Sequence, residues 1–145
     1  MSLFGKVVLW LHIGFAIFAI GPLTAVTSSV PRYIRSRDVA VLRYLQRATR
    51  IFGVLTLGVF ATGLVLGGDK LGAPYLSASM TLFVVALALM VFIERDEGAA
   101  IRALTNENPK DDAKVQVGRI AAMGGITAVI WLVILFLMVF FDPTL

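Results

Sequence analysis

Four long apolar segments alternate with short polar segments along the chain. The apolar runs cover about residues 7–30, 51–66, 75–93 and 120–141, and none of them contains an acidic side chain, a lysine or an arginine. Each run is close in length to the roughly 17–25 residues of helix that cross the hydrocarbon core of a bilayer. The pattern predicts an all-α fold, a four-helix transmembrane bundle that forms a single integral membrane domain over residues 1–145.

The limits of the helices follow from where the apolar pattern starts and stops. The four membrane-spanning helices are expected over about residues 3–29, 51–67, 75–94 and 118–141. The helical pattern continues into polar sequence next to three of these spans, which predicts cytoplasmic helical extensions over residues 38–50, 95–104 and 111–117.

Two prolines and one acid mark the first half of the chain. Gly21-Pro22 lies inside the first apolar run and predicts a kink near Phe18, because proline removes a backbone donor and clashes one turn back. The first helix is expected to end near Ser29, just before Pro31. Asp38 is the expected N-cap of the second helix.

Basic residues are concentrated in two of the loops. Residues 31–50 hold six arginines, and residues 94–119 hold five basic side chains, whereas only Lys6 and Lys70 lie in the other polar segments. Cytoplasmic loops of membrane proteins carry an excess of Lys and Arg. The count predicts an N-out and C-out topology, with an Arg-rich inner loop between the first two helices and a short outer loop at residues 67–76.

Composition agrees with a membrane protein and excludes several kinds of chemistry. Hydrophobic residues make up 59% of the chain, against about 45–50% in soluble domains. The net charge of +4 comes mostly from the Arg-rich loop, so it indicates topology and no nucleic-acid binding. The chain has no cysteine, which excludes disulfides, thiolate metal sites and thiol redox chemistry. No nucleotide-binding or hydrolase motif is present, and the sequence offers no catalytic residue.

His12 is the one ionisable side chain inside the apolar runs. Ala16 and Ala19 share its helical face, and small residues mark close helix packing in membranes, so His12 is expected to point into the bundle. One interpretation is a neutral histidine bonded to a backbone carbonyl or hydroxyl of a neighbouring helix. The other is a haem or copper site, in which Met80 and Met138 are the available soft ligands, since both are expected at the same outer end of the bundle as His12. No dedicated metal cluster is expected.

Small residues on the second and fourth helices suggest packing seams. Gly53, Gly63 and Gly67 lie along one stripe of the second helix, and Gly125 lies on the fourth. Such residues let helices approach closely, either within one chain or between two chains. We expect these four glycines to be helix-packing positions.

Arg43, Arg47 and Arg50 follow one another along one side of the second helix, at its cytoplasmic end. Together with the acids of residues 94–97, Glu97 among them, they are expected to form a solvated belt of charges at the membrane surface, in which each pair contributes little energy. The alternative is a site for anionic lipid headgroups or for a partner protein, built from the arginines. We therefore expect these three arginines to be lipid or partner contacts.

Three short features carry a resemblance to known families. They are Leu11-His12 in the first helix, the arginines that open the second helix, and Thr62-Gly63-Leu64 late in the second helix. On these features the chain resembles an uncharacterised bacterial family of small four-helix integral membrane proteins, distantly like the membrane domain of the copper-resistance protein CopD. His12 and Pro31-Arg32 also make it similar to the four-helix membrane protoporphyrinogen oxidases, a likeness that implies haem bound through His12.

The sequence favours a non-catalytic, multi-pass protein of the bacterial inner (plasma) membrane. Abundant packing positions and absent catalytic motifs suggest an accessory or assembly subunit of a larger complex, in contact with lipid and with other membrane proteins or a second copy of itself. Enzymatic activity stays undecided but is not favoured, and no cofactor is expected. The alternatives are a haem- or copper-handling protein that uses His12, and a transporter of small solutes or lipids.

Overall fold

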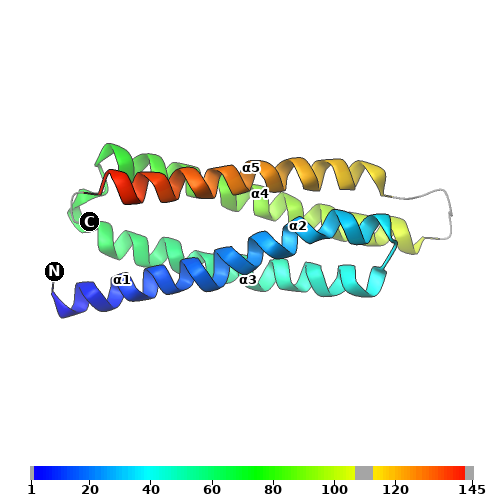
Figure 1. Ribbon diagram of the computed structural model, residues 1–145, viewed down its shortest axis with the longest axis horizontal. Helices are drawn as coiled ribbons and strands as arrows, with labels where there is room; N and C mark the ends of the chain where they lie inside the picture. Colours follow the sequence, from blue (N-terminus) through cyan, green and yellow to red (C-terminus); the bar gives the residue numbers. More distant parts are fainter. Residues whose placement is uncertain (1, 107–112, 143–145) are drawn as a thin grey trace.

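The structure is a computed structural model that describes residues 2–106 and 113–142. Within those residues the chain forms four long helical rods that lie side by side (Figure 1). The first rod is built from α1, a π-helical turn and α2. The elements are α1 (Leu3–Phe15), η1 (Ala16–Ile20), α2 (Gly21–Arg35), α3 (Val39–Gly67), the 3-10 turn η2 (Gly68–Lys70), α4 (Pro74–Thr105) and α5 (Lys114–Phe140).

All four rods are long and apolar enough to cross a membrane. They have 33, 32, 32 and 27 residues, and their most apolar windows have mean hydropathies between 2.0 and 2.6. Large apolar side chains such as Trp10, Phe18, Leu132 and Phe140 are exposed on the outside of the bundle. A surface of this kind is suited to lipid and unsuited to water. The predicted all-α four-helix fold is confirmed, and the chain is a multi-pass membrane protein by its four candidate spans.

The first rod differs from the sequence prediction at both of its prolines. A kink is expected before Pro22, and at that place the structure has the π-helical turn Ala16–Ile20. This turn fits the missing amide hydrogen of Pro22, which cannot form the usual α-helical hydrogen bond. The expected end near Ser29 is wrong, because α2 continues through Pro31 to Arg35. Val30, Pro31 and Ile34 are all buried, so packing offsets the backbone bond that Pro31 cannot make.

The second and later helices lie close to their expected positions. Asp38 caps α3 through a 3.2 Å hydrogen bond from the Val41 amide to its carboxylate, and α3 then runs without a break to Gly67. α4 likewise continues past the apolar run to Thr105. α5 begins at Lys114, and the first part of the extension expected over 111–117 lies outside the described residues.

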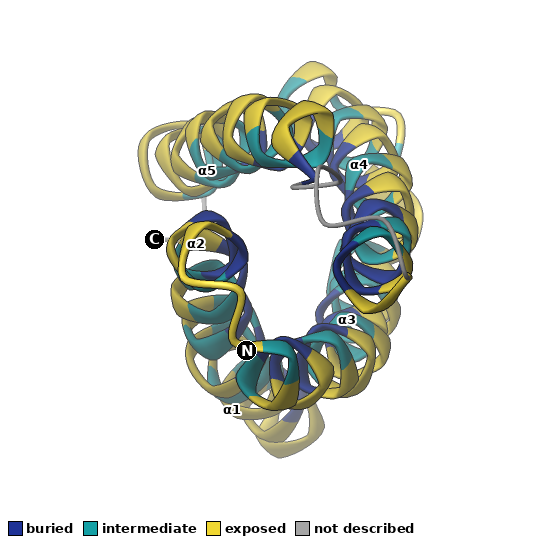
Figure 2. Ribbon diagram, turned by 90° about the vertical axis from the view of Figure 1, so that its right-hand side faces the viewer, coloured by how far each residue is buried: buried dark blue, intermediate teal, exposed yellow. Residues whose placement is uncertain are grey.

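The core occupies one half of the bundle. An end-on view shows the rods arranged around a common axis, with buried residues toward the axis and exposed residues outside (Figure 2). The main cluster of buried side chains joins the end of α2 and the start of α3 to the end of α4 and the start of α5, at the end opposite the two termini. Its members include Leu23, Ile34, Leu42, Ile93 and Ile120. The half that contains α1 has fewer buried side chains, and α1 itself buries only Val8.

Candidate ligand cavity

A cavity of about 570 Å³ lies in the half of the bundle that contains the termini. All four rods line it, through α1 with η1, α3, α4 and α5. Apolar side chains dominate the lining, and the polar or ionisable side chains among the residues that line it are His12, Tyr75, Ser79, Trp131 and Asp142. A largely apolar cavity with few polar groups is the usual form of a small-molecule site.

His12 is held against α3 by hydrogen bonds to one of its ring nitrogens. Its Nδ1 lies 3.0 Å from the carbonyl oxygen of Val59 and 3.0 Å from the hydroxyl oxygen of Thr62. α1 supplies the histidine and α3 supplies both partners, so these contacts join two of the helices that line the cavity. The interpretation of His12 as a side chain bonded to a backbone carbonyl and a hydroxyl describes this geometry.

The partners of Nδ1 decide where the ring carries its hydrogen. A carbonyl oxygen only accepts, so the bond to Val59 requires a hydrogen on Nδ1. The Thr62 hydroxyl donates its hydrogen to the carbonyl oxygen of Gly58, 2.7 Å away. Its oxygen therefore acts as an acceptor toward Nδ1 of His12. In the neutral ring the lone pair is then on Nε2, which has no hydrogen-bond partner among the residues that the structure describes. This arrangement, with a carbonyl on one nitrogen and the other left available, is also typical of metal-binding histidines.

Two glycines of α3 make room for the first rod. A Cβ added at Gly63 would lie 3.2 Å from Cε1 of His12, and one added at Gly58 would lie 2.8 Å from the ring of Phe15. Gly67 is also tightly packed, because an added Cβ would lie 2.5 Å from a methyl group of Leu71. Gly58 is a close-packing position that the sequence prediction did not name.

Gly53 and Gly125, the other two glycines predicted as packing positions, have a different environment. An added Cβ at either position would meet no other atom within 4 Å. These two glycines therefore have open space beside them in the single chain.

Met80 and Met138 line the same cavity as His12. The sequence could place these methionines only at the same end of the bundle, and the structure brings all three residues to one space. Their thioether sulfurs and the Nε2 of His12 are donors of the kind that soft metal ions accept. Within residues 2–106 and 113–142, no group of three or more His, Cys, Asp or Glu side chains could hold a metal ion.

Aromatic rings form one side of the cavity. The ring of Phe83 in α4 lies between Phe60 of α3, at a centroid distance of 5.4 Å, and Trp131 of α5, at 5.2 Å. The indole nitrogen of Trp131 is buried and has no hydrogen-bond partner among the described residues. Only the aromatic composition of the apolar runs could have pointed to this cluster.

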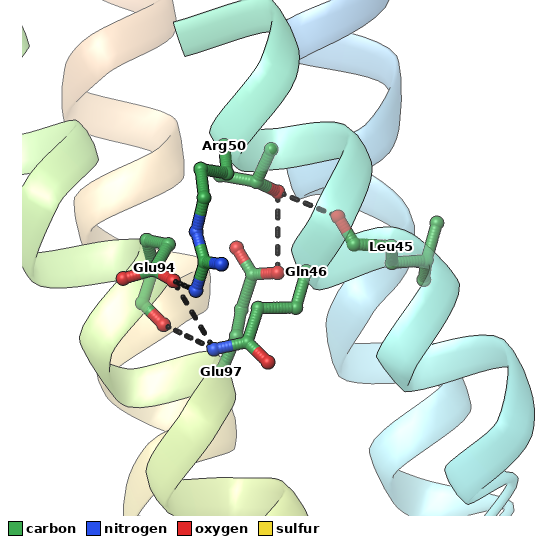
Figure 3. A network of polar contacts seen from close by, with 6 residues as sticks. Leu45, Gln46, Arg50, Glu94 and Glu97 are labelled. Carbon is green, nitrogen blue, oxygen red and sulfur yellow. Dashed lines mark hydrogen bonds and ion pairs between the residues drawn. The ribbon is translucent and has the colours of Figure 1, made fainter. Parts of the chain in front are cut away.

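A second polar region lies in the packed half of the bundle and joins α3 to α4 (Figure 3). Arg50 forms an ion pair of 2.7 Å with Glu94, and Gln46 donates to the same carboxylate at 3.2 Å. The hydroxyl of Thr49 lies 3.1 Å from one carboxylate oxygen of Glu97 and 2.9 Å from the carbonyl oxygen of Leu45. Of the three arginines predicted as lipid or partner contacts, Arg50 thus has an ion-pair partner within the chain, while Arg43 and Arg47 are exposed on α3.

Glu97 is the residue that the sequence prediction treated least accurately. It was expected in a solvated belt of charges, but it is only 1% exposed and one of its carboxylate oxygens has no hydrogen-bond partner among the described residues. Its helical spacing from Ile93, Ala100 and Ile101, all on the buried face of α4, is the signal that could have shown this.

The chain matches no protein-family model, no curated protein and no solved structure, so its family is not identified by likeness.

Proposed function

We propose that this protein is a non-catalytic membrane protein that holds an apolar or amphipathic molecule in the cavity between its four helical rods. The observation that carries the proposal is the cavity of about 570 Å³, which all four rods line and in which His12 is held by α3. A space of this size falls within the range of small-molecule sites. Its apolar lining favours a molecule that is dissolved in the lipid.

His12 is the proposed polar anchor of the bound molecule. Nδ1 donates to Val59, so Nε2 offers a lone pair to a ligand that carries an O–H or N–H donor. Long-chain alcohols, protonated fatty acids and hydroquinones combine such a donor with an apolar body. A ligand of this class favours the lipid-transporter alternative over a carrier of charged solutes.

Quenching of Trp131 fluorescence tests the proposal. The chain has two tryptophans, and Trp10 is exposed on the outside of α1, so a Trp10→Phe variant reports only from the cavity. A brominated long-chain alcohol added to the protein in detergent should quench Trp131 and saturate at about one molecule per chain. Ser79→Phe, which places a ring at a residue that lines the cavity, should abolish the saturable part.

The control for that experiment is Val84→Phe, because Val84 lies on the same helix and is exposed on the outside. This variant should leave saturable quenching unchanged. Quenching that never saturates, or that is equal in Ser79→Phe and Val84→Phe, would reflect partition into the micelle and would refute a cavity site.

Haem or copper is the second candidate for the occupant, favoured by the position of Met80 and Met138 on the same cavity as His12. The Nε2 of His12 and the two thioether sulfurs would hold the group, which would supply electron transfer or metal storage. An absorption spectrum of gently purified protein, reduced and oxidised, together with metal analysis, tests this candidate. A Soret band or stoichiometric copper that is lost in His12→Ala would support it, and a featureless spectrum without metal would contradict it.

An accessory or assembly role in the bacterial inner (plasma) membrane is compatible with ligand binding. Gly53 and Gly125 have open space beside them in the single chain, so a helix of a partner or of a second copy has room to approach there. Copurification of a stoichiometric partner, lost when either glycine is replaced by leucine, would support this role. A protein that stays monomeric without a partner would contradict it.

A further inference from the structure

A second cavity, of about 560 Å³, lies at the end of the bundle opposite the termini. It is formed where α2 ends and α5 begins, and we call it the basic cleft. Its lining residues are Ile34, Arg35, Arg37, Lys114, Val117 and Gly118. Three of these six described residues, Arg35, Arg37 and Lys114, are cationic, and none of the six is acidic.

The backbone of the turn after α2 is fixed by hydrogen bonds. The amide of Arg37 donates to the carbonyl of Ile34 at 3.0 Å, and the amide of Asp38 donates to the carbonyl of Tyr33 at 3.0 Å. Arg37 itself has a φ of 56°, which is unusual for a residue with a side chain and persists where the surroundings enforce it. The main chain that carries Arg35 and Arg37 therefore has a defined position beside the start of α5.

Apolar residues form the floor of the basic cleft. Ile34 is fully buried, and Val117 packs against the core from α5. Gly118 has no atom within 4 Å of the place that a Cβ would occupy, so the side of α5 next to Lys114 is left open. Cations at the rim and apolar groups beneath them match a molecule with an anionic head and a hydrocarbon body.

We propose that the basic cleft binds the phosphate group of an anionic membrane phospholipid. Arg35, Arg37 and Lys114 supply the positive charge for the phosphate, and Ile34 and Val117 contact the first carbons of the acyl chains. Basic pockets between transmembrane helices on the cytoplasmic side are known to hold such headgroups. This inference is independent of the His12 cavity, which lies at the other end of the bundle.

Native mass spectrometry of the full chain in detergent tests the inference, with phosphatidylglycerol as the probe. The double variant Arg35→Gln/Lys114→Gln should weaken binding at least about tenfold, since each basic residue near a phosphate contributes to its attraction. The control Arg95→Gln/Arg102→Gln removes the same charge from exposed positions of α4 and should change binding less than about twofold. An equal loss in both double variants would show general attraction and overturn the inference.

A second variant tests the shape of the cleft without changing its charge. Gly118→Leu should fold, because leucine favours helix more than glycine does, and should reduce phosphatidylglycerol binding at least about tenfold by filling the open side of the cleft. Gly124→Leu, at another glycine of α5 with open space beside it, should bind as the wild type does. Equal binding by phosphatidylcholine, or displacement of the lipid by millimolar inorganic phosphate, would overturn the assignment to an anionic lipid.

Discussion

His12 shows how a single side chain can be fixed by its surroundings at the residue scale. Its Nδ1 lies 3.0 Å from both the Val59 carbonyl oxygen and the Thr62 hydroxyl oxygen, and these two contacts hold that nitrogen toward α3. The inward orientation of the His12 side chain was predictable from the sequence, because the small residues on the same helical face indicate a face turned toward other helices. Its partners on α3 were not predictable, because they depend on the axial position of α1 relative to α3.

Gly63→Ala tests the fit between His12 and α3. The new Cβ would lie 3.2 Å from Cε1 of His12, so the ring has to give way by a few tenths of an ångström, and we expect its bond to Val59 to lengthen because that bond holds the ring in place. Gly53→Ala, at an open position of the same helix, is the matched control. We expect Gly63→Ala to be less stable than Gly53→Ala by about 1–2 kcal/mol in unfolding titrations in mixed micelles. Equal stabilities of the two variants would contradict the contact.

Thr49 is the second residue whose partner can be tested directly. Among the described residues, its hydroxyl is the one hydrogen-bond partner of the buried carboxylate of Glu97, at 3.1 Å. Thr49→Val keeps the shape of the side chain but leaves that carboxylate without a donor, which should lower the free energy of unfolding by about 1–3 kcal/mol. Thr49→Ser keeps the hydroxyl and should lose less than half as much. Similar losses in both variants would mean that packing, and not the hydrogen bond, matters there.

At the scale of helices, the apolar pattern predicted the elements well and their ends less well. The four rods and the Asp38 cap follow from periodicity and local chemistry, which are properties of neighbouring residues. The continuation of α2 through Pro31 does not, because it depends on burial of Val30 and Ile34 against other helices. The same limit applies to Glu97, whose burial is set by the packing of α4 and not by its own polarity.

Two ion pairs that join helices in the described part of the chain should differ in their effect on stability. Arg50 is 67% exposed and its partner Glu94 is 23% exposed, whereas Asp96 is only 10% exposed beside Arg119, whose Nε lies 3.1 Å away. Arg119→Met would leave a nearly buried carboxylate without its cation and should cost about 1–3 kcal/mol. Arg50→Met should cost about 0–1 kcal/mol, since Gln46 still donates to Glu94. Unfolding titrations of both variants check this order, and the reverse order would contradict it.

At the scale of the whole molecule, the bundle has a packed half and a half that contains the His12 cavity. The core cluster lies toward the end of the basic cleft, and the cavity lies toward the termini. The sequence predicted four spans and the end of the bundle at which His12, Met80 and Met138 lie. It could not predict the cavity, because the space left between four helices depends on their separation and rotation, which no local pattern encodes.

The proposed N-out and C-out orientation is open to a direct test, because the chain has no cysteine of its own. Ser36→Cys and Asn106→Cys place single thiols at the basic end of the bundle, and Gly72→Cys places one at the opposite end. A membrane-impermeant maleimide should label Gly72→Cys in intact cells, and should label the other two only after the cells are opened. The opposite labelling pattern would reverse the proposed orientation.

The cavity as a ligand site is tested most directly by native mass spectrometry of protein purified in a mild detergent. Wild type and Val84→Phe should each carry one added apolar molecule per chain, Ser79→Phe should carry none, and His12→Phe should retain much less than wild type. Bare masses for all four proteins, or the same adduct on all four, would contradict the account.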